Sequence, residues 1–311
     1  MTTHETYLVG DGAGSSRLET STYTMPGPGE IGITVHYAGL CKSDLEGVRF
    51  SQELGERFGH EVYGRVSESA DPEFPVGASV LALIGHGYAS HVVTATENVV
   101  RIPDAVDAKT ASIAEPVACI LAGMDMLDLR DVDRAAVVGA GFMGLLVVKL
   151  LAVRGLSVTV FEPRATARAT ALRMGASEAK DPSERGPKDE FPLVIEVTGS
   201  QPGLTLAESL TVESGVLSIT GFHQSQGGER QIRMADWNWK CLTVINAQIR
   251  SLPRTLMLME RAIRLFSNGT LDMSTLITHE LALAEVPEFI EAGGDRDDTY
   301  IKAVVDCSPT T

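Results

Sequence analysis

The spacing of apolar residues between positions 135 and 250 predicts an alternation of strands and helices. An apolar run at 135–138 is followed by glycines, a long apolar helical stretch and an alternating strand at 157–161. Later strands are predicted near 192–197, 215–220 and 242–247. Strands that alternate with helices form a parallel sheet covered by helices. The pattern therefore predicts an α/β fold containing a doubly wound parallel sheet.

The chain on either side of this segment has a different pattern. Residues 1–30 are polar and rich in turns. Short strands are predicted at 31–37, 79–84, 91–95 and 300–305, and helices at 110–127 and between Pro253 and Asn268. Many short strands and glycines before residue 100 indicate a second, β-rich domain.

Composition narrows the class of protein. The chain has 311 residues, enough for about two domains, with 44% hydrophobic and 22% charged residues, which is ordinary for a soluble globular protein. Its net charge of −15 argues against a nucleic-acid or anionic-membrane surface. The four cysteines form no C-x-x-C pair, and the first residues lack the basic and apolar regions of a signal peptide. A cytoplasmic protein without a disulfide framework is expected.

The stretch AAVVGAGFMGLLVVKLLAVRGLSVTVF at 135–161 carries the clearest motif. Gly139, Gly141 and Gly144 form a G-x-G-x-x-G between a predicted strand and a predicted helix, and Glu162 follows the next strand. Such glycines let the backbone approach a pyrophosphate, whose charge is stabilised at the helix N-terminus. A membrane-spanning helix is the alternative for so apolar a stretch, but its glycines, Lys149 and Arg154 argue against it. The motif predicts a dinucleotide site.

The charge of Glu162 bears on the choice of dinucleotide. A carboxylate at this position accepts hydrogen bonds from both hydroxyls of the adenosine ribose and repels a 2′-phosphate. NAD is therefore favoured over NADP. Arg164 and Arg168 follow closely and keep NADP open as the alternative, although surface positions on a helix would also explain them.

Four residues outside this segment are candidate metal ligands. Cys41 and His60 each lie on a turn beside a strand, Glu61 adjoins the histidine, and Glu115 lies at a later turn before a helix. A thiolate, an imidazole and a carboxylate, with water in the fourth place, describe an open tetrahedral zinc site. On spacing alone, packed core residues are the alternative. A zinc ion beside a nicotinamide would polarise an alcohol and let hydride leave its carbon.

Several motifs together resemble the zinc-dependent medium-chain dehydrogenase/reductases, relatives of alcohol, sorbitol and threonine dehydrogenases. The matching segments are GLCKSD at 39–44, GHEVYGRV at 59–66, Glu115-Pro116, the glycine motif at 139–144 and LITH at 276–279. They occur in family order over nearly the whole chain. The resemblance implies a discontinuous GroES-like catalytic domain, 1–119 with 252–311, around a Rossmann dinucleotide-binding domain at 120–251.

The resemblance also implies roles for matching residues. Cys41 and His60 would hold one catalytic zinc, with Glu61 as an exchangeable ligand and Glu115 holding the ion directly or through water. Ser43 would relay the proton of the substrate hydroxyl. Cofactor contacts are implied for Gly139, Gly141, Phe142, Met143, Gly144, Glu162, Arg164, Thr198, Gly199, Gly221 and Lys302.

Two further positions complete the expected catalytic group. Asp44 would fix the orientation of the His60 imidazole. Glu46 stands where relatives often have a proton-relaying histidine; a carboxylate there could pass a proton or contact a polar substrate, or could simply be solvated. Residues 76–91 contain no cysteine, so the lobe that binds a structural zinc in many relatives is expected to be missing.

The expected activity is NAD-linked oxidation of a secondary alcohol in a polyol, sugar, cyclitol or aminoglycoside-type substrate, or the reverse reduction. The segments GFHQ at 221–224 and WNWK at 237–240, polar and aromatic together, suggest a hydroxyl-rich ligand, and a loop or subunit contact is the alternative. The alternatives for the whole chain are a zinc-free enoyl or quinone reductase and a non-catalytic nucleotide-binding protein. The expected partner is a small molecule, not nucleic acid or membrane. A homo-oligomer, dimer or tetramer, paired near 242–248 is also expected.

Overall fold

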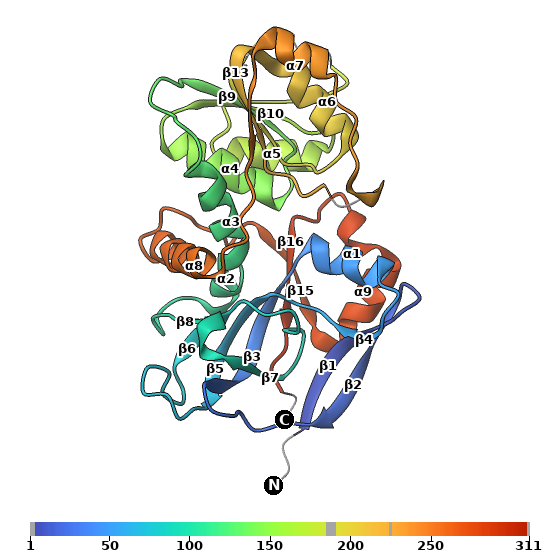
Figure 1. Ribbon diagram of the computed structural model, residues 1–311, viewed down its shortest axis with the longest axis vertical. Coiled ribbons are helices and arrows are strands. Elements are labelled where there is room, and N and C mark those ends of the chain that lie inside the picture. Colours follow the sequence, from blue (N-terminus) through green and yellow to red (C-terminus); the bar gives the residue numbers. More distant parts are fainter. Residues whose placement is uncertain (1–3, 185–190, 224–225, 310–311) are drawn as a thin grey trace. The chain divides into compact units, whose positions relative to one another are not determined.

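The structure is a computed structural model that describes residues 4–184, 191–223 and 226–309. Contacts divide the chain into two compact units: the first runs to Ala118 and resumes at Ser251, and the second is Cys119–Arg250 (Figure 1). Within the described ranges, no helix is long and apolar enough to cross a membrane. The described residues form two sheets in the first unit and one in the second.

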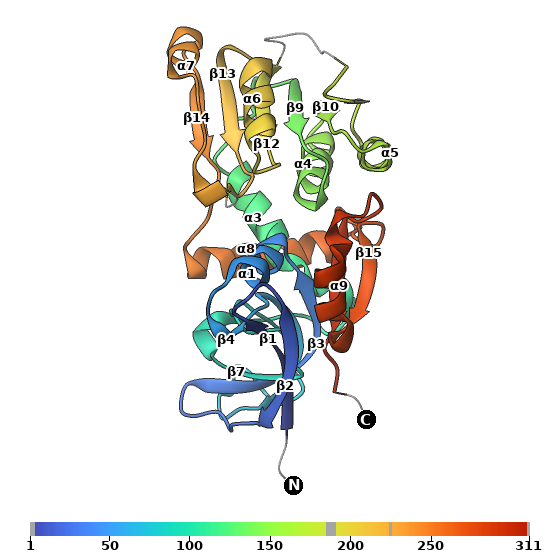
Figure 2. The same cartoon turned by 90° about the vertical axis from the view of Figure 1, so that its right-hand side faces the viewer.

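The second unit contains a parallel sheet. Its strands are β9 (Arg134–Val138), β10 (Ser157–Phe161), β11 (Glu178–Lys180), β12 (Phe191–Glu196), β13 (Thr211–Ile219) and β14 (Thr243–Asn246). They lie in the order β11-β10-β9-β12-β13-β14, and every pairing is parallel. Figure 2 shows β14, β13, β12, β9 and β10 following one another across the sheet. The predicted α/β fold with a doubly wound parallel sheet is confirmed.

Strand order determines where the helices of this sheet lie. They are α4 (Phe142–Val153), α5 (Ala165–Arg173), α6 (Gln201–Leu210) and α7 (Met234–Lys240). The chain moves one way from β9 to β11 and the opposite way from β12 to β14, so right-handed crossovers place α4 and α5 on one face and α6 on the other. Leu204, Ala207 and Leu210 of α6 pack with Val194 and other buried side chains of the sheet. The direction reverses between β9 and β12, and ligands of such sheets bind outside the carboxyl ends of the strands at this reversal.

The first unit is rich in strands. They are β1 (His4–Asp11), β2 (Ser16–Thr22), β3 (Glu30–Leu40), β4 (Leu54–Arg57), β5 (Glu61–Glu68), β6 (Ser79–Ala82), β7 (His91–Ala95), β8 (Val99–Arg101), β15 (Ile277–Ala282) and β16 (Lys302–Asp306). The larger sheet has the order β15-β16-β3-β5-β6-β8, with β7 also paired to β3, and the smaller sheet has the order β2-β1-β4. Because β16 pairs with β3, the end of the chain completes the N-terminal sheet.

The described residues of the first unit and of its boundary with the second also form α-helices. They are α1 (Lys42–Phe50), α2 (Ala108–Ser112), α3 (Ala114–Met124), α8 (Leu252–Ser267) and α9 (Val286–Ala292). The fully buried Ile31, Ile33 and Val35 of β3 lie on the main core together with Leu45 of α1. Burial of these apolar side chains is the main stabilising contribution to the unit.

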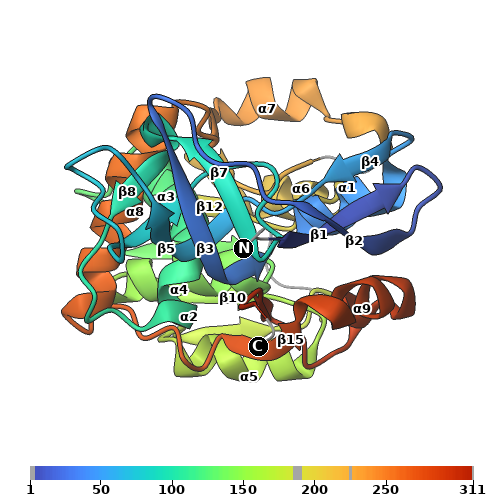
Figure 3. The ribbon, with the colours of Figure 1, turned by 90° about the horizontal axis from the view of Figure 1, so that it is seen from below.

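Among the differences from the sequence analysis are a hairpin at the N-terminal end of the described chain and a division within a predicted helix. The polar, turn-rich N-terminal region forms the hairpin of β1 and β2, whose strands lie side by side in Figure 3. Leu8 and Val9, near the end of β1, are buried in the core. The Ser- and Thr-rich β2 is held in place by its backbone hydrogen bonds to β1. The helix predicted at 110–127 is divided at Ile113: Asp107 caps α2 by accepting from the Thr110 amide, and α3 begins with Pro116 in its first turn.

Candidate functional site

Antiparallel pairing brings the candidate metal ligands to one end of the larger sheet. Cys41 directly follows β3, while His60 and Glu61 lie where β5 begins, and Gly39 pairs with Glu61. Lys302 begins β16, which also runs antiparallel to β3. A strand that ends and two that begin there gather residues from three distant parts of the chain.

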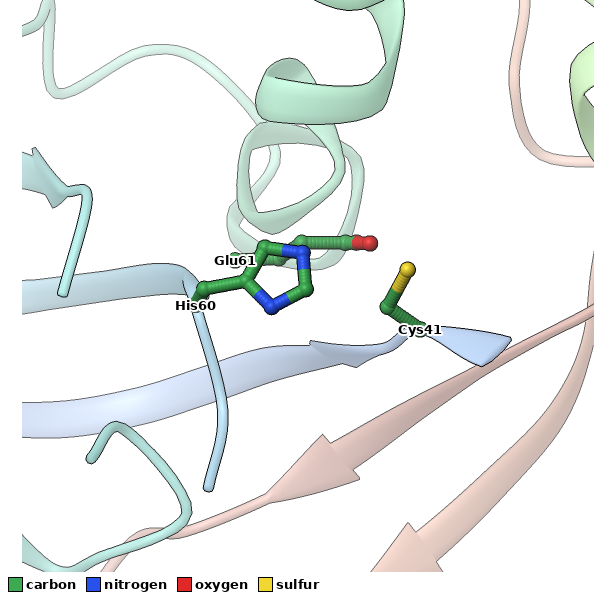
Figure 4. A group of neighbouring side chains, drawn as sticks. All are labelled: Cys41, His60 and Glu61. Carbon is green, nitrogen blue, oxygen red and sulfur yellow. The ribbon is translucent and has the colours of Figure 1, made fainter. Parts of the chain in front are cut away.

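Cys41, His60 and Glu61 form a compact donor group, drawn in Figure 4. One possible ligand atom from each residue lies within 4.8 Å of the others. Glu115, the fourth candidate, lies near the first turn of α3, with its Oε2 3.9 Å from Nε2 of His60. The structure thus brings three of the four predicted ligands together and places Glu115 beside one of them, His60.

The orientation of His60 is set from its far side. Its Nδ1 lies 3.0 Å from Oδ1 of Asp44, so Nε2 is the nitrogen that faces Glu115. Asp44 is held in turn by the Tyr88 hydroxyl, which donates to its Oδ2 at 2.8 Å, and by a weaker contact from the Gly59 amide. A carboxylate behind a ligating histidine fixes the tautomer and the ring orientation.

Acidic groups around His60 and Lys302 favour positive charge here. Burial opposes the imidazolium, but hydrogen bonds with Asp44 and Cys41 outweigh it and raise the pKa of His60 to about 12. Burial likewise opposes the ammonium of Lys302, but the charges of Glu61 and Cys41 raise its pKa. The site is therefore suited to holding a cation.

Glu61 carries the observation that bears most directly on a metal. Its side chain is fully buried, and Oε1 accepts from Nζ of Lys302 at 2.7 Å. Among the described residues, Oε2 is one of the few buried side-chain oxygens without a hydrogen-bond partner. Gly39 allows the close approach, since a Cβ there would lie 1.9 Å from Oε2. A buried oxygen without a partner beside a thiol and an imidazole fits a zinc ligand set.

Ser43 and Glu46 both lie on α1. The Ser43 hydroxyl donates to Sγ of Cys41 at 3.2 Å, which places it against the donor group. Oε1 of Glu46 lies 3.9 Å from Nζ of Lys42, one turn earlier on the helix. Lys302, expected at the cofactor, forms a buried ion pair with Glu61, a contact that sequence reasoning did not foresee.

The glycine turn of the second unit connects β9 to α4. Gly139 has a φ of +104°, and a Cβ on Gly144 would lie 2.1 Å from the Gly139 carbonyl oxygen. Both positions therefore require glycine. At Gly141, the N-cap of α4, a Cβ would meet nothing within 4 Å. The open space next to the Cα atom of Gly141, at the N-terminus of α4, would allow a phosphate group to approach the backbone.

Phe142 and Met143 form the first turn of α4, and Phe142 is buried. Glu162 lies beside this turn, because its Oε2 accepts from the Ala140 amide at 2.8 Å. Its Oε1 accepts from the Arg164 backbone amide and from Nε of Arg164, both at 3.0 Å. The structure thus brings the predicted acid and the predicted arginine together.

Thr198, Gly199 and Gly221 follow β12 and β13. They surround Glu196, the last residue of β12, which sequence reasoning missed. This fully buried carboxylate accepts from the Thr198 and Gly199 amides and pairs with His223. The available signal was an acid ending an otherwise apolar strand.

Of the two segments that suggested a hydroxyl-rich ligand, His223 and Trp237 are engaged within the second unit, Phe222 and Trp239 are exposed, and Gln224 lies outside the described residues. His223 contacts Glu196 and Arg230. Trp237 packs against the cluster of buried side chains under α6. These contacts explain both residues without a substrate.

Comparisons with known proteins agree with these features. Residues 27–104 match the alcohol dehydrogenase GroES-like domain. The chain is 22% identical to a 2-dehydro-3-deoxy-L-galactonate 5-dehydrogenase of Pseudoalteromonas atlantica, over 91% of this chain and 93% of that protein. It is 22% identical to the sorbitol dehydrogenase of Rattus norvegicus, over 97% and 96% respectively.

A solved structure extends the comparison to the fold. It comes from Sinorhizobium meliloti, is described as a zinc-binding dehydrogenase and contains bound NADP. The match has a TM-score of 0.87 at 23% identity and covers 98% of this chain and 99% of that one. The domain match, the full-length relatives and the shared fold all support the resemblance of this chain to the medium-chain dehydrogenase family.

Proposed function

We propose that this protein is a zinc-dependent, NAD-linked dehydrogenase that oxidises a secondary alcohol of a polyol, sugar, cyclitol or related substrate to a ketone, or catalyses the reverse reaction. The buried, unpartnered Oε2 of Glu61 beside Cys41 and His60 carries the proposal. The sugar-acid and polyol dehydrogenases among the relatives support the substrate class.

Cys41, His60, Glu61 and Glu115 are the residues that would hold the ion. When bound there, zinc supplies a Lewis acid that favours loss of the proton from a substrate hydroxyl. Asp44 accepts from Nδ1 of His60, so Nε2 is the nitrogen that would give up its proton and bind the ion. Lys302 balances the charge of Glu61 in the buried interior.

Ser43 is the proposed first acceptor of the substrate proton. Its hydroxyl can both accept and donate, and its contact with Sγ of Cys41 places it beside the ligands. A nicotinamide cofactor, when bound, would supply the acceptor for the hydride of the carbinol carbon, while the hydroxyl proton would leave through Ser43. Glu46, on the same helix as Ser43, is proposed as a later proton carrier.

The second unit is proposed as the dinucleotide-binding domain and the first as the catalytic domain. Gly141 leaves room for the pyrophosphate, and Glu162 lies beside the turn, where it can reach the adenosine ribose. The carboxylate favours NAD, and the guanidinium of Arg164 beside it is the feature that would admit NADP. The absence of a structural zinc, a cytoplasmic location and a homo-oligomeric state belong to the same proposal.

The test combines a metal analysis with an activity screen. The purified protein is assayed for zinc and then screened with polyols, sugar acids, sugars and cyclitols, with NADH formation read by absorbance. The proposal expects about one zinc per chain and turnover that a strong chelator abolishes. Turnover without zinc would identify a zinc-free reductase, and NADH binding without turnover or zinc a non-catalytic nucleotide-binding protein.

A further inference from the structure

A chain of three polar side chains crosses the carboxyl ends of β12 and β13. Glu196 ends β12 and is fully buried, and its Oε2 lies 2.9 Å from Nε2 of His223, in the segment after β13. Nδ1 of the same ring accepts from Nε of Arg230 at 2.7 Å. The imidazole thus connects a buried carboxylate to a guanidinium.

The partners assign one protonation state to the ring. The guanidinium of Arg230 can only donate, so Nδ1 of His223 must be an acceptor, and the ring proton lies on Nε2, where Glu196 accepts it. A neutral imidazole satisfies both neighbours. This matters because a buried carboxylate is costly unless its hydrogen bonds are made.

The same network determines the backbone of two loops. Oε1 of Glu196 accepts from the amides of Thr198 at 2.6 Å and Gly199 at 3.0 Å. From the other side, Nη2 of Arg230 donates to the Gly199 carbonyl at 2.8 Å. Gly221 packs against them so closely that a Cβ there would lie 2.3 Å from the Gly199 nitrogen. Residues 197–199 after β12 and 220–223 after β13 are therefore held together through Glu196, His223 and Arg230.

Both segments follow strands of the half of the sheet formed by β12, β13 and β14. The glycine turn follows β9, which belongs to the other half with β10 and β11, and the strand order reverses between β9 and β12. In doubly wound folds one half of a dinucleotide lies on each side of this reversal. We propose that His223 and Arg230 are positioning residues that hold these two loops in the shape that receives the nicotinamide half; the inference rests on the dinucleotide function proposed above.

The experiment compares a ligand that contains both halves of the cofactor with one that contains only the adenosine half. Calorimetry on the full-length protein measures binding of NADH, which spans both halves, and of ADP, which offers only the adenosine half. His223→Ala and Arg230→Ala are expected to weaken NADH binding by about tenfold or more, because each removes a hydrogen bond involving a charged group. ADP binding should stay within about twofold. Arg233→Ala is the matched control, since Arg233 forms an exposed ion pair with Asp236 in the same stretch of chain.

A rescue variant separates positioning from general damage. In His223→Gln, one neutral amide supplies both a donor for Glu196 and an acceptor for Arg230, so NADH affinity should return to within about threefold of the original. Equal losses of NADH and ADP binding, or unchanged NADH binding in both alanine variants, would overturn the inference. If the unmodified protein binds neither ligand, the proposed function itself fails, and the inference fails with it.

Discussion

The two candidate sites are built in opposite ways. The glycine turn of the second unit and its acid, Glu162, are separated by one helix and one strand, and the turn offers a ligand mainly backbone groups. The donor group of the first unit, Cys41, His60 and Glu61, comes from two strand ends and lies beside Glu115 of α3 and Lys302 of the last strand. The first arrangement is local, and the second depends on topology.

The two sites also differ in whether they bury charged side chains. At the glycine turn, the critical positions lack side chains, and the space at Gly141 is open. In the donor group, Glu61 and Lys302 are both buried and compensate each other's charge. Substitutions at the glycine turn should therefore change the shape of the backbone that receives a ligand. Substitutions in and around the donor group should change the buried charge or the binding of a metal.

The largest effect is expected at Cys41. Cys41→Ser should remove the bound zinc and lower turnover by at least about a hundredfold, because several kcal/mol of charge stabilisation are lost with the metal. The fold should persist, since β3 and α1 pack through other side chains. Zinc analysis, a dehydrogenase assay and circular dichroism check this. Cys241→Ser, at an exposed cysteine of the second unit, is the control and should keep its zinc and activity.

A substitution of Lys302 tests whether the buried carboxylate of Glu61 needs a positively charged partner for the protein to be stable. Lys302→Met should lower the free energy of unfolding by about 3–5 kcal/mol, because Glu61 would remain buried without its partner. Urea denaturation measures the change. Lys42→Met removes a lysine that is largely exposed and should change stability by less than about 1 kcal/mol. Equal effects of the two substitutions would contradict the assignment.

Two alanine substitutions compare neighbouring glycines of the turn. Gly144→Ala should destabilise the protein by about 1–3 kcal/mol, because its Cβ would collide with the Gly139 carbonyl. Gly141→Ala should leave stability nearly unchanged yet weaken NADH binding by about tenfold or more, since the methyl group would occupy the phosphate position. Thermal melting and calorimetry distinguish them. NADH affinity unchanged by Gly141→Ala would exclude this turn as the pyrophosphate site.

The smallest effect concerns cofactor choice. Glu162→Ala should weaken NAD binding by about three- to tenfold and improve the relative use of NADP, because it removes both the acceptor for the ribose hydroxyls and the carboxylate that would repel a 2′-phosphate. The ratio of kcat/KM for the two cofactors measures this. Adding Arg164→Ala should cancel the gain with NADP, and a preference that Glu162→Ala leaves unchanged would contradict the ribose role.

The fold and the glycine turn were largely predictable because they rest on local periodicity. The apolar strands and glycines around Gly139 determine that region through short-range rules. The hairpin of β1 and β2 was not predicted, because β2 is polar and is stabilised by its pairing with β1. The division of the predicted helix at Ile113 was not predicted either. The whole stretch has a helical pattern, and the Asp107 cap that begins α2 is a local signal of only a few residues.

The candidate metal residues could be named from the sequence, but their surroundings could not. The ion pair of Lys302 with Glu61 joins residues 241 positions apart and needs the register of β16 against β3 and of β3 against β5. The Glu196–His223–Arg230 chain likewise depends on parallel neighbours within a sheet. Both contacts follow from tertiary pairing, which single-sequence periodicity does not determine.

X-ray absorption at the zinc edge tests the central claim most directly. The purified protein should contain about one zinc per chain, with one sulfur at about 2.3 Å and nitrogen or oxygen ligands at about 2.0–2.2 Å. Cys41→Ser should remove the sulfur shell or the metal. Protein without zinc, or zinc surrounded by four sulfurs, would contradict the assignment of Cys41 and His60 as the centre of a catalytic metal site.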